Sequence, residues 1–188
     1  MLCQLILLLA ILSVALSFAP TARFGGSRTA LKMGMPASVK PGVVTGPALI
    51  DLLNYAKEAE FAIPGVNIVG TSSINSCMEA AKKYGGPIMV TFSKGGGQFI
   101  AGKAADNSND AASIAGTIAG AKHVREVAAL YGVPVVLHTD HCQKAWLPWI
   151  DGLMSANEEY FARKVRNINS SIGSSKRVKT YVFVPHMH

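Results

Sequence analysis

The sequence predicts an α/β protein built on a parallel sheet. Two observations carry this prediction. Short apolar segments, each opened by a glycine or proline signal, alternate with longer segments that have helical periodicity. Each apolar segment also ends in polar or glycine-rich residues, so reactive side chains follow the predicted strands. Strands that alternate with helices pair in parallel, and the ends of such strands lie along one edge of the sheet.

The amino terminus is predicted to be a targeting sequence that lies outside the folded domain. Residues 1–17 form an apolar run that is too short to span a membrane comfortably and ends in small residues, as signal peptides do. Residues 18–35 are basic, rich in small and hydroxyl residues, and contain no Asp or Glu, which is typical of a transit peptide. The junction around Phe18 resembles the bipartite presequence of algae with complex plastids. We therefore expect a plastid location, with simple secretion as the alternative, and no stable membrane anchor.

The first part of the mature chain predicts a helix, a strand and a second helix. A proline in its first turn and one apolar face predict a helix over about residues 47–60. Residues 61–67 form a short apolar strand that ends near Asn67. The second helix is expected to begin at a cap formed by Thr71 or Ser72 and to end at a glycine pair, residues 85–86.

The next part repeats the alternation twice. Residues 87–92 are a buried strand, and residues 93–109, which open with Ser93 and three glycines, are predicted to be a loop. A third buried strand covers residues 134–138. A last helix follows and is expected to end near Tyr160.

A long helix joins the predicted strands over residues 87–92 and 134–138. It is predicted to run from Ala111 to about Tyr131, with Asp110 as its cap and a glycine at its end. Its apolar face is predicted to consist of Ile114, Ile118, Ala121, Val124, Val127 and Leu130. We expect this face to pack on the sheet.

Length and charge narrow the function classes. The 188 residues fit one domain, and the formal net charge is +7. The basic residues gather at the two ends of the chain, and no basic helix face interleaved with aromatic residues occurs between them, so no nucleic-acid partner is expected. The cysteines Cys3, Cys77 and Cys142 do not suggest a disulfide framework.

The strand ends carry the chemistry. The third strand changes abruptly from apolar residues into His138, Thr139, Asp140, His141 and Cys142, a mixture of metal ligands and proton-transfer groups. Seen alone, this is either a metal site with an adjacent acid or base, or a polar cap with hydrogen-bonded histidines. The earlier strands end at Asn67 and Ser93. In a (β/α)8 barrel these ends would converge on one face, whereas in an open sheet they would be spread along one edge.

Six segments together resemble class II, zinc-dependent fructose-bisphosphate aldolase, over about residues 40–161. They are Lys40–Gly46, Pro64–Asn67, Phe92–Ser93, Phe99–Lys103, Tyr131–Cys142 and Leu147–Gly152. The resemblance implies an α/β fold of the (β/α)8 TIM-barrel family, of which only about the first half, residues 36–162, is present. A complete barrel typically has about 250 residues.

The resemblance also implies an activity and its residues. The reaction is cleavage of fructose 1,6-bisphosphate to dihydroxyacetone phosphate and glyceraldehyde 3-phosphate, with Zn2+ as a Lewis acid. His141 matches a zinc ligand, and Asp140 matches the acid/base that exchanges a proton with the C4 oxygen. Ser93 matches a substrate-binding position, and Asn67 is a plausible substrate contact. Full-length family members are expected to be homodimers.

Three neighbouring residues are expected to have other roles. His138 is interpreted as a packed structural or supporting histidine, and Cys142 as a packed side chain without a ligand role. Lys94 departs from the small amide expected after Ser93. It is interpreted as a solvated loop residue, with a phosphate contact as the alternative.

The carboxyl-terminal residues depart from the family. Residues 163–188 are predicted to be a divergent basic tail without helical or strand periodicity, the product of truncation or mis-splicing. Within it, Tyr181 to His188 could form a fourth strand, and His186 and His188 are not expected to bind metal. The activity is therefore expected to be impaired in this chain. The alternatives are a non-catalytic half-barrel that associates with intact aldolase, and a zinc aldolase acting on tagatose bisphosphate.

Overall fold

The computed structural model describes residues 34–172, with side chains described up to residue 167. It contains a four-stranded parallel sheet in the order β1-β4-β3-β2. The elements are β1 (Gly42–Val43), α2 (Pro47–Glu58), β2 (Gly65–Asn67), α3 (Thr71–Tyr84), β3 (Ile88–Phe92), α4 (Lys94–Ala101), η2 (Ser108–Asp110), α5 (Ala111–Tyr131), β4 (Pro134–Thr139), η3 (Lys144–Trp146) and α6 (Leu147–Ile172). The predicted parallel α/β architecture is confirmed.

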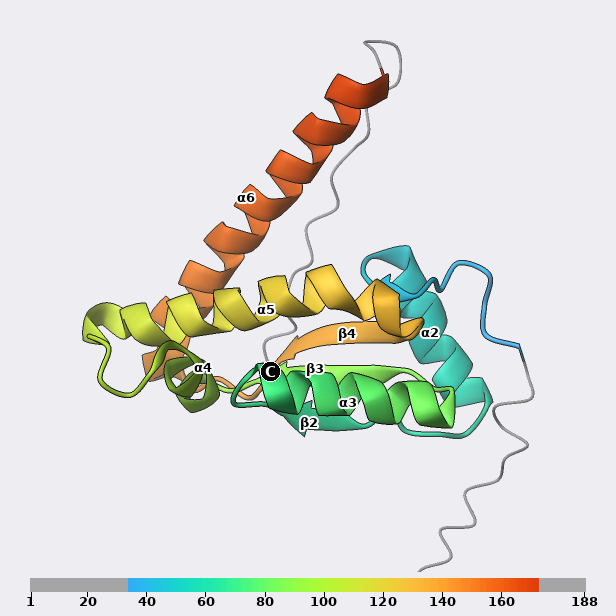
Figure 1. Cartoon of the computed structure of the whole chain (residues 1–188), viewed down its shortest axis with the longest axis horizontal. Coiled ribbons are helices and arrows are strands. Elements are labelled where there is room, and N and C mark those ends of the chain that lie inside the picture. Colours follow the sequence, from blue (N-terminus) through green and yellow to red (C-terminus); the bar gives the residue numbers. More distant parts are fainter. Residues whose placement is uncertain (1–33, 173–188) are drawn as a thin grey trace, which may run out of the picture.

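The arrangement of the helices places the strand ends on one side of the molecule. Figure 1 shows α2 at the end of the sheet where β3 and β4 begin, and α4 with the start of α6 at the end where they finish. Helices α3 and α5 cover one face of the sheet, and α2 packs against Val136 on the other face. The segments that follow the strands therefore lie together at one end.

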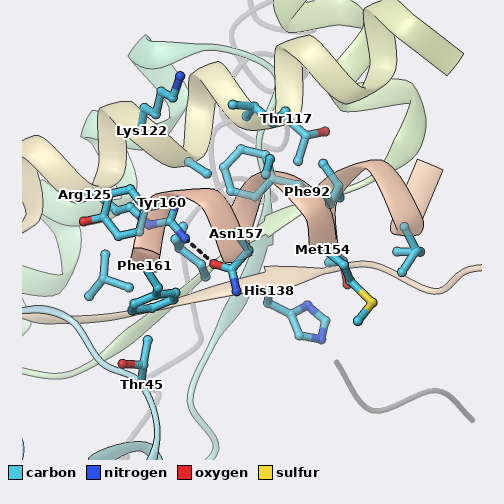
Figure 2. A pocket seen from close by; sticks show the side chains of 18 of the residues that line it. Thr45, Phe92, Thr117, Lys122, Arg125, His138, Met154, Asn157, Tyr160 and Phe161 are labelled. Atoms are coloured by element: carbon cyan, nitrogen blue, oxygen red, sulfur yellow. Dashed lines mark hydrogen bonds between the residues drawn. The ribbon is translucent and has the colours of Figure 1, made fainter. Parts of the chain in front are cut away.

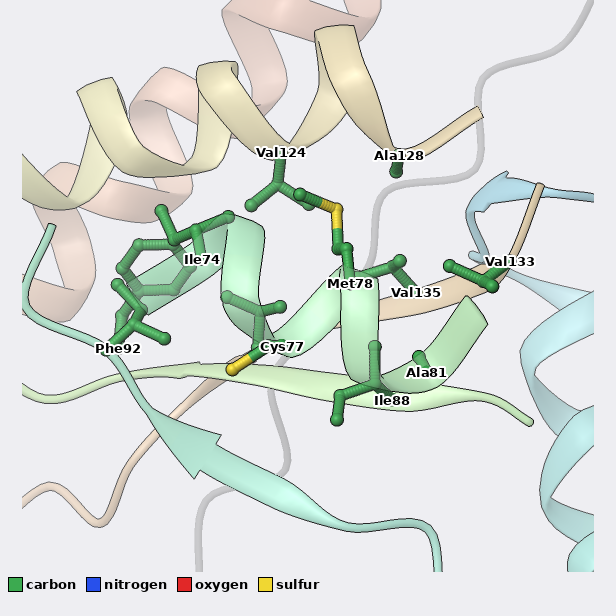
Figure 3. Close-up of a cluster of buried hydrophobic side chains, with 12 residues drawn as sticks. Ile74, Cys77, Met78, Ala81, Ile88, Phe92, Val124, Ala128, Val133 and Val135 are labelled. Carbon is green, nitrogen blue, oxygen red and sulfur yellow. The ribbon is translucent and has the colours of Figure 1, made fainter. Parts of the chain in front are cut away.

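The main core lies between α3, α5 and the sheet (Figure 3). Strand side chains alternate between the two faces, so every second residue of β3 and β4 enters this core. Its largest fully buried members are Phe92, Ile68, Ile74, Met78, Val90, Val124 and Val135. This core fixes the direction of β3 and β4, and with it the position of their ends.

Strand β1 is not foreseen by the sequence pattern. It is only two residues long, and it pairs with the first two residues of β4. The amide of Val44 extends the contact by donating to the carbonyl of Val135 at 2.9 Å. Strand β2 is also shorter than expected: the prediction of a strand over residues 61–67 has the correct end at Asn67, but only Gly65–Asn67 pairs with β3.

The predicted loop over residues 93–109 is wrong in its first half. Residues Lys94–Ala101 form α4, and Ser93 is its N-cap, whose hydroxyl accepts a hydrogen bond from the amide of Gly96 at 3.0 Å. Gly96 and Gly97, expected to open the loop, are instead needed for close packing. A Cβ on Gly97 would meet the Thr117 hydroxyl and the Ser113 carbonyl at 2.3 and 2.5 Å.

The predicted bounds of α5 are confirmed, but its predicted apolar face is confirmed only in part: Ala121, Val124 and Val127 lie in or against the main core. Leu130 is 79% exposed, and Val124 is the one member of the predicted face that is fully buried. The buried face is made mostly of small residues: Ala112, Ser113, Gly116, Thr117, Gly120, Val124 and Ala128. Small residues face inward because α4 and the sheet approach α5 so closely that larger side chains would not fit: a Cβ on Gly116 would lie 1.9 Å from the Gly97 carbonyl.

The ends of three helices differ from expectation. Gly70, not Thr71 or Ser72, is the N-cap of α3, and the Ser73 hydroxyl accepts hydrogen bonds from the amides of Val69 and Gly70. Asp110 precedes α5 as predicted, but its side chain makes no cap hydrogen bond. Helix α6 continues beyond Tyr160.

The prediction of irregular structure after Ala162 is wrong up to Ile172, where α6 ends. The predicted fourth strand at Tyr181 and the terminal histidines lie outside the described residues, as do residues 1–33, which make up the presequence except for its last two residues. No helix in the described range is long and apolar enough to cross a bilayer.

Candidate active site

The register of the sheet lines up three polar side chains across three strands. Asn67 of β2 is paired with Thr91 of β3, and Thr91 is paired with His138 of β4. Residues two positions earlier on β3 and β4, Met89 and Val136, pack on the α2 side of the sheet. By strand alternation this polar row therefore faces away from the main core, on the α2 side of the sheet.

Asp140 lies at the end of this row. Its amide donates to the carbonyl of Phe92 at 2.9 Å, which continues the β4–β3 pairing and brings Asp140 next to the start of the segment that carries Ser93. The side-chain amide of Asn67 donates to Asp140 Oδ2 at 2.8 Å, and the amide of His141 donates to Oδ1 at 2.9 Å. The structure thus brings together the four residues predicted from the sequence, Asn67, Ser93, Asp140 and His141, which we call the strand-tip site.

These hydrogen bonds set the charge of the carboxylate. The hydrogen bond from Asn67 is the main influence and lowers the pKa of Asp140. Burial acts against it as the second influence, and the amide of His141 and the nearby imidazoles lower the pKa further. Hydrogen bonds to the charged form of a carboxyl group favour ionisation. Asp140 is therefore an ionised proton acceptor at neutral pH, with two donors that fix its orientation.

Thr91 is a site residue that the sequence analysis missed. Its hydroxyl lies 3.3 Å from His138 Nδ1, and the side chain is buried. The signal was available, since Thr91 is the one polar residue in the otherwise apolar strand β3. The prediction that His138 is packed is wrong: the imidazole is exposed, and Thr91 holds it through one ring nitrogen.

Lys94 is not the solvated loop residue that the sequence suggested. It is the first residue of α4, and its Nζ lies 2.7 Å from Asp110 Oδ1 and 5.5 Å from the centre of the Trp146 ring. Cys142 is half-buried beside it. Burial raises the pKa of the Cys142 thiol, and the charge of Lys94 lowers it to a lesser extent.

His141 carries the exposed imidazole of the site, and the Trp146 ring lies 6.1 Å away between ring centres. One imidazole does not make a catalytic zinc site, which keeps three protein ligands. Within the described side chains, no three His, Cys, Asp or Glu residues gather closely enough to hold a metal ion. The donors of this part of the chain therefore do not complete a zinc site, and other ligands would have to come from residues outside it.

A groove lies along the outer edge of β4, beyond its short pairing with β1. It holds a cavity of about 140 Å³ between β4, α5 and α6 (Figure 2). We define this α6 groove by Leu137, Ile118, Ala121, Leu153, Met154 and Phe161. Its walls are mostly apolar. On the edge of β4 that faces away from β3, no strand lies beside Leu137–Thr139 in the described part of the chain.

Arg125 is the charged group of this groove. Its guanidinium lies 4.0 Å from the centre of the Tyr160 ring and donates to Asn157 Oδ1 at 2.8 Å (Figure 2). Burial lowers the pKa of Arg125, and the neighbouring Tyr160 partly offsets this. Both contacts are to α6, so Arg125 links that helix to α5.

A parallel sheet with a carboxylate and an imidazole at its strand ends defines the class: this is part of an α/β barrel with a site at the carboxyl-terminal ends of its strands. Residues 48–170 match the family model described as fructose-bisphosphate aldolase class-II. The chain belongs to this family.

Individual relatives agree with the family match. The chain is 53% identical over 133 residues to a fructose-bisphosphate aldolase of Edwardsiella ictaluri. The aligned residues cover 71% of this chain and 37% of that protein. It is 52% identical over 134 residues to the class 2 enzyme of Escherichia coli K12, with the same coverage. A crystal structure of fructose-bisphosphate aldolase from Campylobacter jejuni aligns with a TM-score of 0.65 at 51% identity, covering 69% of this chain and 37% of that one. The chain thus spans little more than a third of the length of these relatives.

Proposed function

We propose that the strand-tip site is the amino-terminal portion of a class II aldolase active site whose substrate is fructose 1,6-bisphosphate. The hydrogen bond between Asn67 and Asp140 carries this proposal. It joins the ends of β2 and β4 and holds an ionised carboxylate directly before His141. An ionised carboxylate that is held in this way can accept a proton from a bound substrate.

The proposed reaction uses Asp140 as a base. Its carboxylate accepts the proton of the C4 hydroxyl of fructose 1,6-bisphosphate while the C3–C4 bond breaks. The C4 oxygen becomes the aldehyde of glyceraldehyde 3-phosphate, and the electron pair of the broken bond stays on C3, which takes up one proton to give dihydroxyacetone phosphate. In the condensation direction Asp140 returns the proton. Asn67 orients the carboxylate, and Ser93, at the start of α4, contacts the substrate.

Zn2+ is the proposed cofactor, and His141 is the residue of this part of the chain that would bind it. When bound, the ion supplies Lewis-acid polarisation of the substrate carbonyl. The exposure of the His141 imidazole supports this role, and the described residues alone do not complete the set of ligands.

The proposed roles can be tested in a chimera. Residues 40–161 replace the matching segment of the Escherichia coli relative, and aldolase turnover and zinc content are measured. Asp140→Asn is expected to lower kcat by roughly 10²–10⁴-fold with zinc retained, as for loss of a general base. His141→Ala is expected to lose zinc. Asp151→Asn, a carboxylate on α6, is the control. Equal kcat values for Asp140→Asn and the control would refute the role of Asp140.

Plastid targeting remains our proposal for residues 1–35. The absence of Asp and Glu from residues 18–35, directly after the apolar run, supports it. A fluorescent protein fused to residues 1–35 is expected to enter the plastid of an alga with complex plastids, and Phe18→Ala is expected to prevent import. Secretion of both fusions would favour the secretory alternative.

A second candidate function is a non-catalytic half-barrel that binds intact aldolase. The specific observation in its favour is the α6 groove beside the open edge of β4, since an unpaired strand edge accepts a further strand. Gel filtration of the chain with and without the Escherichia coli relative separates the two candidates. A mixed complex favours the half-barrel, whereas self-association alone agrees with the homodimer that we propose for the full-length form.

A further inference from the structure

Lys94 and Asp110 form the most buried ion pair of the described residues. Their side chains are 20% and 15% exposed, and Nζ lies 2.7 Å from Oδ1. Removing one partner of such a pair leaves the other charge without compensation in a partly buried place. The pair joins the start of α4, directly after Ser93, to the start of α5.

The backbone around Asp110 is unusual for its sequence. Asn109 and Asp110 have φ angles of 53° and 62°, in the left-handed region that non-glycine residues adopt rarely and at a cost. Asp110 does not use its carboxylate to cap α5; Asn107 Oδ1 accepts from the Ser113 amide instead. The turn therefore directs the Asp110 carboxylate to Lys94 and leaves the helix cap to another residue.

The ammonium group of Lys94 also lies above the ring of Trp146, at a distance at which cations are attracted to aromatic faces. Trp146 is half-buried in η3, and its ring is tilted by 30° from the His141 imidazole at 6.1 Å between centres. Contacts thus lead from Asp110 through Lys94 and Trp146 to His141. The backbone of His141 is fixed separately by its hydrogen bond to Asp140.

We propose that Lys94 is a positioning residue for His141: held by Asp110, it keeps Trp146 behind the imidazole and restricts the rotation of that ring. A phosphate contact is a weaker explanation of Lys94, because its charge already has a partner. The consequence for zinc binding rests on the proposed function, whereas the restriction of the ring does not.

The test uses the full chain without metal at one fixed pH and measures the His141 ring resonances by NMR. Trp146→Leu removes the ring current at His141 and defines the unrestrained value. Lys94→Met and Asp110→Asn are expected to move the His141 resonances toward that value. Lys103→Met, a lysine of the segment after α4 that bonds to Gln98, is the control and is expected to move nothing.

The outcomes separate positioning from a structural role. If Lys94→Met lowers the melting temperature but leaves the His141 resonances in place, the proposal is wrong. If Lys94→Met does not fold, Trp146→Leu decides, because unchanged His141 resonances in that variant would show that the indole does not restrain the ring. Full activity of the Asp140→Asn chimera would refute the proposed function and leave this result unaffected.

Discussion

The two edges of β4 are covered very differently, although the same helix, α5, packs over both. Toward β3 the strand is paired from Val135 to Thr139. Val135, which β1 also covers on the other edge, is fully buried in the main core. On the outer edge β1 covers two residues, and Leu137, two positions further along the strand, is only half-buried beside the α6 groove. Both residues are aliphatic, so the difference shows that a neighbouring strand, and not side-chain type, decides how completely the sheet is covered.

The largest expected difference is between two methionines. Met78 is fully buried in the main core (Figure 3), whereas Met154 lines the α6 groove (Figure 2). Met78→Ala is expected to lower the free energy of unfolding by about 2–5 kcal/mol, because it leaves a cavity. Met154→Ala is expected to cost less than about 1 kcal/mol, since solvent already reaches the groove. Urea denaturation of both variants measures the difference, and similar losses would show that the groove is as closed as the core.

Two glycines sharpen the same contrast. A Cβ on Gly116 would collide with the backbone of α4, whereas the nearest atoms to one on Gly152 belong to the Ile114 side chain. Gly116→Ala is expected to lower stability by about 1–3 kcal/mol, because backbone cannot move aside easily. Gly152→Ala is expected to cost less, since an isoleucine can change rotamer.

Gly95→Ala is the control for the glycine pair, because no atom lies within 4 Å of its added Cβ. Thermal unfolding of the three variants, followed by circular dichroism, measures the order. A melting temperature for Gly116→Ala equal to that of the control would contradict the close approach of α4 and α5.

A pair of arginines tests how α6 is held. Arg125 contacts Tyr160 and Asn157, whereas Arg163 forms a pair with Glu159 in which both side chains are well exposed. Arg125→Met is expected to cost about 1 kcal/mol and to speed hydrogen exchange in α6, with the α3 amides unchanged. Arg163→Met is expected to change neither, as surface ion pairs contribute little. Uniform loss of protection in both helices would mean that the groove and the core unfold as one unit.

The smallest expected effect on stability concerns the strand-tip site, at the carboxyl-terminal end of β4. Asn67→Ala removes the main influence on Asp140 and is expected to raise the pKa of Asp140 toward its ordinary value of about 3.9. Because the pKa of Asp140 is lower in the folded chain than in the unfolded chain, its ionised carboxylate stabilises the fold above that ordinary value. This stabilisation is lost as the pH falls through the pKa of the folded chain. NMR titration of the carboxyl carbon measures it. Asn75→Ala, which removes an amide bonded to His123 instead, is the control and should leave the Asp140 pKa unchanged.

Much of the fold could be predicted because it depends on local patterns. The buried strands, the long helix after Asp110 and the parallel arrangement follow from apolar runs and glycine or proline signals. Helix α4 could not be predicted in this way, because a run of glycines locally favours a loop. The contacts that require Gly96 and Gly97 come from other segments of the chain. The small residues of the inward face of α5 could not be predicted for the same reason, since the closest contacts select for small residues and not for the most apolar ones.

The site residues were predictable to the extent that strand order places them. Asn67, Ser93 and Asp140 follow consecutive parallel strands, so their approach needs no knowledge of side chains. The roles of Thr91 and Lys94 depend on a register pair and on a strained turn that brings Asp110 to the start of α4. Neither can be derived from spacing along the chain.

The position of β1 has a consequence for biosynthesis. β2, β3 and β4 pair with their neighbours in sequence, so the sheet can extend in the order in which the ribosome releases the chain. β1 is translated before all of them and yet pairs with β4. A nascent polypeptide halted before Pro134 could already join β2 to β3, while Gly42 and Val43 would still await their partner. The segment that is translated first therefore cannot enter the sheet until β4 has been released.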